Sequence, residues 1–273
     1  MLAFYTVASA VLILVGNAFF PIFGHSYSWW LVPVLLIGLI VAWILLHGIV
    51  LCLWVLTIRL DRPVKKESSL FRQFIARTVD LLFSLARICV EVSGIEKIPA
   101  DSRFLLVCNH RTELDPAFII NALPNAQLGF IGKKEVYTGM RFIARIMHRL
   151  QGLPIDRENT RAAVTTVLSA AELLKNDRVS VALFPEGYTN RTAEILLPFR
   201  NGSFKIATKS EVPIVVCTLC DTKKIFKNMF RRKTVIYFDV LDVLDSHHPT
   251  AEIGAQADKL MRENLQKRFA ELS

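Results

Sequence analysis

The sequence predicts an α/β fold with a mixed, largely parallel sheet flanked by helices, preceded by an N-terminal transmembrane helical hairpin. Residues 1–58 contain no Asp, Glu, Lys or Arg, so all 33 basic and 24 acidic residues follow them. From Gly94 onward, short apolar runs alternate with helical patterns, which is typical of parallel sheets covered by helices. Two polar motifs, Asn109–Asp115 and Phe184–Gly187, each follow an apolar run, as loops at the ends of strands do.

The charge-free start predicts a membrane anchor over residues 1–60. Two apolar stretches, about Leu2–Phe23 and Leu31–Ile58, each reach the roughly 20 residues that a spanning helix needs. Between them, Gly24–Trp30 combines a polar break with two tryptophans that suit the membrane interface. A first stretch that re-enters the membrane without crossing it is one alternative, and a buried core hairpin is another.

Basic residues after the second stretch set the expected orientation. Arg59, Arg62, Lys65 and Lys66 follow it closely, and such charges stay on the cytoplasmic side of a membrane. The sequence therefore predicts an integral membrane protein whose termini and α/β domain lie on the cytoplasmic face. The five cysteines are expected to remain reduced there.

The rest of the chain divides into residues 61–93, a juxtamembrane linker and amphipathic helix, and residues 94–273, the α/β domain. The helix, Leu70–Val92, is expected either in the membrane interface or packed on the domain. Six strands are expected, at Arg103–Cys108, Gln127–Gly132, Gly152–Ile155, Val179–Phe184, Ile214–Leu219 and Thr234–Val240. Helices are expected at Ala117–Ala122, Gly139–Leu150, Thr160–Lys175, Ser203–Lys209 and Thr250–Leu272.

The first motif, Asn-His-Arg-Thr-Glu-Leu-Asp, places four residues between His110 and Asp115. Imidazole titrates near neutral pH, so His110 is the natural general base. An aspartate on the other ring nitrogen would fix the tautomer and stabilise the imidazolium that forms. Asp115 also precedes Pro116, so capping the following helix is the structural alternative, and the two roles are compatible.

The two motifs, in this order, resemble the glycerolipid acyltransferase family over roughly Glu96 to Leu219. The resemblance implies acyl transfer from a thioester, acyl-coenzyme A or acyl carrier protein, to the free hydroxyl of lysophosphatidic acid, which makes phosphatidic acid. It implies direct transfer, with His110 and Asp115 catalytic, backbone amides of the motif loop near the oxyanion, and no metal or other cofactor. The alternatives are an acyltransferase for another lysophospholipid or glycerol-3-phosphate, and an inactive, membrane-anchored lipid-binding protein.

Further matches to the family concern the acceptor's phosphate. They imply substrate-binding roles for Arg157, Arg191 and Lys133, with Glu186 positioning the site and Gly187 allowing a tight turn. After Phe-Pro-Glu-Gly the family often has Thr-Arg-Ser-Arg, whereas this chain has Tyr-Thr-Asn-Arg and keeps only the last arginine. A solvated surface charge is the alternative for each basic residue.

Two other patterns have simpler interpretations. Cys217 and Cys220 have Cys-x-x-Cys spacing without a second pair, so a core strand is expected there rather than a zinc site. Lys223–Lys233 interleaves basic with apolar residues. This run suits anionic membrane lipids or the phosphates of a donor better than nucleic acid, and a solvated strip is the alternative.

Overall fold

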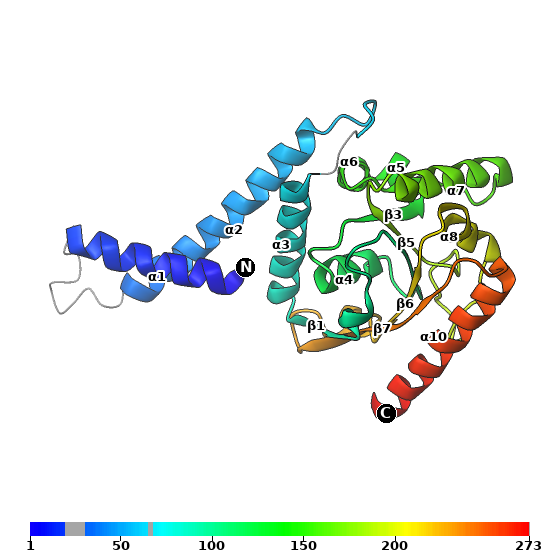
Figure 1. Cartoon of the computed structure of the whole chain (residues 1–273). Coiled ribbons are helices and arrows are strands. Elements are labelled where there is room, and N and C mark those ends of the chain that lie inside the picture. The colour runs from blue at the N-terminus through cyan, green and yellow to red at the C-terminus, as the bar shows by residue number, and fades with distance from the viewer. Residues whose placement is uncertain (20–30, 65–67, 273) are drawn as a thin grey trace.

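The computed structural model describes residues 1–19, 31–64 and 68–272, and shows a pair of apolar helices projecting from an α/β domain (Figure 1). Helices α1 (Leu2–Phe19) and α2 (Leu31–Thr57) expose apolar side chains along their outer faces. Among the described residues, only α2 is long and apolar enough to cross a membrane. The predicted spanning helix is therefore found at the second stretch.

The first apolar stretch is described only in part. Helix α1 has 18 described residues, which at 1.5 Å per residue reach about 27 Å, and the predicted stretch continues into residues outside the described ranges. The first predicted span therefore stays a prediction. Gly24–Trp30, Lys65 and Lys66 lie outside the described residues.

A buried histidine joins the two apolar helices to helix α3 (Ser69–Leu85). His47 of α2 hydrogen-bonds to the Tyr5 hydroxyl of α1 through Nδ1 and to Thr78 Oγ1 of α3 through Nε2, both at 2.8 Å. Its ring also stacks on Phe74 of α3 at 4.4 Å. These contacts tie the anchor to the rest of the chain through polar groups that would otherwise be buried without partners.

Helix α3 packs on the α/β domain, which was one of its two expected positions. Phe71 and Ile75 are buried, and Phe83 stacks on Phe118 at 4.9 Å. The helix ends at Leu85, earlier than predicted, because Arg87 takes a left-handed conformation with φ 59°. The next residues form strand β1 rather than the last turns of the helix.

The sheet has seven strands in the order β1-β7-β6-β2-β5-β3-β4. All neighbours pair in parallel except β6 and β7, so the predicted mixed, largely parallel sheet is confirmed. The strands are β1 (Ile88–Ser93), β2 (Leu105–Cys108), β3 (Leu128–Lys133), β4 (Leu153–Ile155), β5 (Ser180–Leu183), β6 (Ile214–Cys220) and β7 (Thr234–Leu244).

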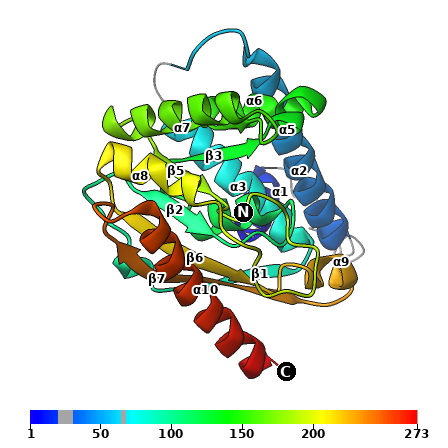
Figure 2. The same ribbon diagram turned by 90° about the vertical axis from the view of Figure 1, so that its right-hand side faces the viewer.

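Helices cover both faces of the sheet (Figures 1 and 2). Alternate residues of β2 point to opposite faces of the sheet. Leu105 and Val107 belong to the core under α7, α8 and α10. Leu106 and Cys108 belong to the core on the other face, under α3 and α4. The helices of the domain are α4 (Asp115–Ala122), α5 (Lys134–Gly139), α6 (Arg141–Arg149), α7 (Thr160–Lys175), α8 (Lys205–Ser210), α9 (Lys224–Asn228) and α10 (Thr250–Leu272), with single 3-10 turns η1 (Ile95–Lys97) and η2 (Asn201–Phe204). Helices α5 and α9 were not predicted as separate elements.

Five neighbouring strands end on the same edge of the sheet. Strands β6, β2, β5, β3 and β4 run parallel in this lateral order, so the loops that follow them lie side by side at their carboxyl ends. His110 follows β2 and Glu186 follows β5, while Arg157 comes after β4 at the outer end of this row. Ligands of open α/β sheets bind at this edge.

Candidate active site

The structure brings His110 and Asp115 together as the sequence predicted. His110 Nδ1 lies 2.9 Å from Asp115 Oδ2. Asp115 is fully buried at the first residue of α4, and the His110 side chain is 13% exposed. A buried carboxylate thus holds the imidazole while one edge of the ring remains accessible.

Asp115 is fixed by three further hydrogen bonds. Its Oδ2 accepts the backbone N–H of Arg111 at 2.6 Å and of Thr112 at 2.9 Å, and its Oδ1 accepts the Thr112 hydroxyl at 2.7 Å. A carboxylate that accepts from every side requires His110 Nδ1 to carry the proton in the neutral ring. The second nitrogen, Nε2, therefore presents a lone pair.

His110 Nε2 faces the loop that follows β5. Thr189 Oγ1 lies 3.2 Å from it, and with Nε2 as acceptor the threonine hydroxyl donates this bond. The ring also stacks on Phe184, with 4.1 Å between centroids, and the Asn190 N–H donates to the His110 carbonyl at 2.7 Å. The orientation of the ring is thus determined from both motifs.

Glu186 links the two motifs from a buried position. One carboxylate oxygen accepts the backbone N–H of His110 at 2.7 Å, and the other accepts that of Leu197 at 2.8 Å. Burial raises the pKa of this carboxyl, although the two N–H groups and the nearby His110 oppose the shift. These contacts support the positioning role expected for Glu186.

The backbone of the first motif is already engaged. The amides of His110, Arg111 and Thr112 donate to Glu186 or Asp115, so the expectation that the motif loop supplies oxyanion donors is wrong for these three. The neighbouring thiol is also unsuited to catalysis, because burial raises the pKa of Cys108 and suppresses its thiolate. This agrees with direct transfer.

Two arginines meet at the exposed ring of Tyr188. The guanidinium carbons of Arg157 and Arg200 lie 5.3 and 5.0 Å from its centroid. Burial, and then the positive charge of Arg200, lower the pKa of Arg157. Within the described residues neither arginine has a carboxylate within 4.0 Å, so the half-buried Arg157 and the exposed Arg200 lie at one ring without an ion-pair partner. We call Arg157, Tyr188 and Arg200 the arginine pair site.

Gly187 shapes the arginine pair site. Its φ of 77° lies in the left-handed region, and an added Cβ would stand 2.7 Å from Arg200 Nε and 2.9 Å from Arg200 Cδ. The Arg200 N–H also donates to the Pro185 carbonyl at 2.9 Å, which joins its segment to the second motif. The tight turn expected at Gly187 is confirmed.

The sequence did not single out Arg200. It ranked Arg191 beside Arg157, and Lys133 after these two. The structure separates them. Arg191 is 78% exposed and pairs with Glu113 at 2.6 Å, while Lys133 is 54% exposed and lies 3.7 Å from Glu135. Both have acidic partners, in contrast to the arginine pair site.

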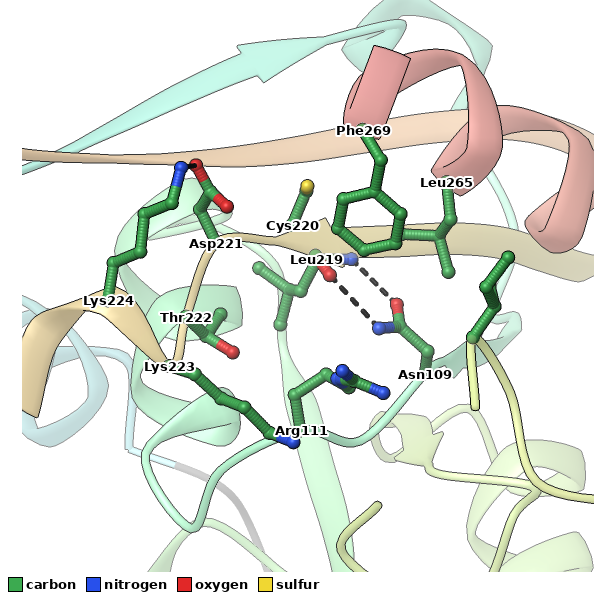
Figure 3. A pocket seen from close by; sticks show the side chains of 11 residues that line it. Asn109, Arg111, Leu219, Cys220, Asp221, Thr222, Lys223, Lys224, Leu265 and Phe269 are labelled. Carbon is green, nitrogen blue, oxygen red and sulfur yellow. Dashed lines mark hydrogen bonds and ion pairs between the residues drawn. The ribbon is translucent and has the colours of Figure 1, made fainter. Parts of the chain in front are cut away.

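A cavity of about 240 Å³ lies on the other side of the first motif, beside the end of β6 (Figure 3). Asn109 forms its floor and is fixed to Leu219 by two hydrogen bonds, of 3.0 and 2.8 Å. Arg111, Lys223 and Lys224 surround it, and Leu265 and Phe269 of α10 close one wall. We call this the Arg111–Lys223 pocket.

The described residues contain no group of three or more His, Cys, Asp or Glu side chains arranged to hold a metal ion. Cys217 and Cys220 are buried in β6, so the predicted core strand is confirmed for this pair. Burial raises the pKa of both thiols, that of Cys220 to about 11.

Comparison with known proteins agrees with the fold. The model of the family described as "Acyltransferase" matches residues 89–220, the segment that carries both motifs. The crystal structure of the 1-acyl-sn-glycerophosphate (LPA) acyltransferase PlsC from Thermotoga maritima shares the fold, with a TM-score of 0.62 and 23% identity over 82% of this chain and 89% of that one. Residues 89–220 of the chain thus match this acyltransferase family.

Two curated relatives show how far the similarity extends. The 1-acyl-sn-glycerol-3-phosphate acyltransferase of Bacillus subtilis is 28% identical over 203 residues, which cover 73% of this chain and 96% of the relative. The 1-acyl-sn-glycerol-3-phosphate acyltransferase alpha of Mus musculus is 28% identical over 145 residues, 53% of this chain and 50% of the relative. The chain thus spans about half the length of the mammalian relatives that it matches.

Proposed function

We propose that this chain transfers an acyl group from an acyl thioester to the free hydroxyl of lysophosphatidic acid, and so makes phosphatidic acid. The observation that carries the proposal is the buried, fully bonded Asp115 holding His110 Nδ1, which leaves Nε2 facing Thr189 at 3.2 Å as the acceptor nitrogen of the ring. The reaction is the one named for the curated relatives. Apart from the acyl thioester, which is a co-substrate, the proposed mechanism uses no cofactor.

The chemistry follows from the state of the imidazole. As the acceptor oxygen attacks the thioester carbonyl carbon, His110 Nε2 removes the hydroxyl proton, and the imidazolium is stabilised by Asp115. When the carbon–sulfur bond breaks, the imidazolium returns the proton to the leaving thiolate. Thr189 Oγ1, at 3.2 Å from Nε2, marks a position that a hydroxyl oxygen reaches.

The arginine pair site supplies the recognition of the acceptor's phosphate. Arg157 is half-buried, and neither Arg157 nor Arg200 has a carboxylate within 4.0 Å in the described part of the chain, so a phosphate gains charge-assisted hydrogen bonds without displacing an existing ion pair. An acceptor without a phosphate leaves these cations unpaired. This favours lysophosphatidic acid over neutral acceptors.

A non-catalytic lipid-binding protein is disfavoured by the same site. A binding surface has no need for an imidazole whose tautomer is fixed by a carboxylate with four hydrogen bonds. Burying such a carboxylate has a large desolvation cost, which the bonds offset. In a catalyst, the same arrangement orients the general base and stabilises the imidazolium.

The test is a product assay with the full chain reconstituted in lipid vesicles. Wild-type protein receives acyl-coenzyme A or acyl carrier protein with lysophosphatidic acid, other lysophospholipids or glycerol-3-phosphate, and products are identified by mass spectrometry. We expect phosphatidic acid to dominate, and His110→Ala to lower its rate by about 10²–10⁴-fold. The control is His247→Ala, since His247 is exposed and pairs with Asp245 away from both motifs. Normal turnover in folded His110→Ala protein would refute the mechanism.

We also place the α/β domain on the cytoplasmic face of the membrane. The support is the basic Arg59 and Arg62 after α2, and the link from Tyr5 through His47 to Thr78, which brings the start of α1 beside the domain. Ala3→Cys and Ala270→Cys should both resist an impermeant thiol reagent in intact cells. Labelling of either one from outside would overturn this orientation.

A further inference from the structure

The Arg111–Lys223 pocket collects positive charge around an apolar interior. Figure 3 shows the Lys223 side chain extending toward Arg111, whose guanidinium turns toward Asn109, while Lys224 bonds to Asp221 at 2.6 Å. Four apolar side chains line the pocket. Leu219 comes from the end of β6, Ile195 from the segment after the second motif, and Leu265 and Phe269 from α10. An apolar cavity with a few cations at its rim suits a ligand with an extended arm and an anionic group.

The two rim cations have no acid between them. Arg111 donates to the Glu194 carbonyl at 2.7 Å, and in the described part of the chain neither Arg111 nor Lys223 lies within 4.0 Å of a carboxylate. Burial, and then the charge of Arg111, lower the pKa of Lys223, as expected where two cations converge. Lys224, by contrast, already has Asp221 as its partner. An anion between Arg111 and Lys223 relieves their repulsion.

The pocket adjoins the reacting nitrogen without overlapping the arginine pair site. Asn109 forms its floor and directly precedes His110. Along the edge of the sheet, β6 lies on one side of β2, and β5, β3 and β4 lie on the other. The pocket and the arginine pair site thus flank His110 on opposite sides.

The two flanks differ in their distance from the anchor. Helix α6 contacts α2, and His148, just before the start of β4, hydrogen-bonds to the Arg62 carbonyl at 2.8 Å. Helix α10 lies on the side of the sheet away from α1 and α2 (Figures 1 and 2). The flank that contains β4 is therefore nearer to α2 than the flank beside α10.

We propose that the Arg111–Lys223 pocket binds the phosphopantetheine arm of the acyl donor, with its phosphate between Arg111 and Lys223 and its pantetheine chain along Leu265 and Phe269. This rests on the function proposed above. The cavity, about 240 Å³, is smaller than the roughly 300–1,000 Å³ of sites that enclose a whole drug-sized ligand. It accommodates part of a donor, and this part is common to coenzyme A and acyl carrier protein.

The experiment compares an acyl-phosphopantetheine with the matching acyl-pantetheine, which lacks only the phosphate. The protein is the full chain in vesicles, with lysophosphatidic acid as acceptor. Wild type should prefer the phosphorylated donor by about 10- to 150-fold in kcat/KM, the range for a charge-assisted hydrogen bond. Lys223→Gln and Arg111→Gln should each remove most of this preference and leave the KM for the acceptor unchanged.

The control is Lys227→Gln, an exposed lysine of α9 that does not line the pocket. It should keep the full preference for the phosphorylated donor. Acyl-coenzyme A and acyl carrier protein form the next arms, and both should lose rate in Lys223→Gln. A loss of rate with acyl-coenzyme A alone would overturn the proposal that the pocket binds the phosphopantetheine arm. It would assign the pocket to the nucleotide phosphates of coenzyme A.

Two further outcomes would also overturn the proposal. One is an unchanged preference in both pocket variants, and the other is a rise in the acceptor's KM instead of the donor's. Failure of the proposed function is seen separately, as absence of phosphatidic acid from wild type. Calorimetric titration with coenzyme A then tests the pocket alone, and equal affinity in wild type and Lys223→Gln would contradict it.

Discussion

The centre around His110 and the two basic sites beside it differ in how far their polar groups are satisfied within the chain. Asp115 makes four hydrogen bonds and Glu186 makes two, all with neighbours in the two motifs. In the arginine pair site, the cations instead meet each other across Tyr188 without an acid. The centre is complete before a substrate arrives, whereas the basic sites are completed by an anion.

This difference separates two uses of polar residues at one edge of a sheet. A fully bonded group cannot gain much from a ligand, so it serves orientation, and its cost of burial is already offset. A partly desolvated cation without a partner gains most from a ligand and so serves affinity. Arg191 fits neither description, because it is exposed and pairs with Glu113.

The sharpest test of the complete centre is Asp115→Asn. The amide oxygen replaces only one carboxylate oxygen, so the amide NH2 group must face either His110 Nδ1–H or the N–H and O–H donors of the loop. We expect kcat to fall by about 10²-fold, the lower end of general base catalysis, with KM nearly unchanged. Steady-state kinetics and thermal unfolding of the same preparation measure it. A loss of stability without a loss of kcat per folded molecule would make Asp115 purely structural.

The second test contrasts the unpaired Arg157 with the paired Arg191. Arg157→Ala should lower kcat/KM for lysophosphatidic acid by about 10- to 150-fold, the equivalent of 1.5–3 kcal/mol for a charge-assisted bond. Arg191→Ala should change it by less than about 5-fold, because an exposed ion pair contributes at most about 1 kcal/mol. The KM for the donor should stay constant in both. Equal losses in the two variants would abolish the distinction between them.

The third test displaces Arg200 of the arginine pair site by substituting Gly187. In Gly187→Ala the new Cβ must displace Arg200, and the left-handed φ adds strain of order 1–2 kcal/mol. We expect a roughly 10-fold rise in the KM for lysophosphatidic acid and a lower melting temperature. Gly202→Ala is the matched control, since its Cβ would meet nothing within 4 Å. If both variants behave alike, the position of Arg200 is irrelevant to the acceptor.

The smallest expected effect belongs to Thr189. Thr189→Val keeps the shape of the side chain and removes the hydroxyl that lies 3.2 Å from His110 Nε2. Because a neutral hydrogen bond contributes about 0.5–1.5 kcal/mol, kcat should change by no more than about 10-fold, in contrast to His110→Ala. Kinetics with lysophosphatidic acid measure it. A loss as large as that of His110→Ala would make Thr189 part of the proton transfer.

The sequence was most informative where the relevant contacts are local. His110 and Asp115 lie in one loop and at the start of one helix, so their spacing alone brings them together. The strands were predicted for a similar reason, since a parallel sheet covered on both faces needs continuous apolar runs. The end of α3 was missed because the left-handed turn at Arg87 occurs at a residue other than glycine.

The basic residues could not be ranked from sequence because their roles depend on distant partners. Arg157 and Arg200 are 43 positions apart in the chain, and only the row of strand ends brings both to Tyr188. Arg191 looked equivalent to Arg157, and no local pattern indicated that Glu113 would neutralise it.

The reversed strand β7 has a consequence for how this fold can change. Because β7 runs antiparallel to β6, it returns the chain to the opposite edge, where Leu244 pairs with Ile214. Helix α10 then runs back across the sheet, and its second half supplies Leu265 and Phe269 to the Arg111–Lys223 pocket. The two residues lie outside both motifs, so this end of the last helix can diversify to suit other occupants while His110 and Asp115 stay in place.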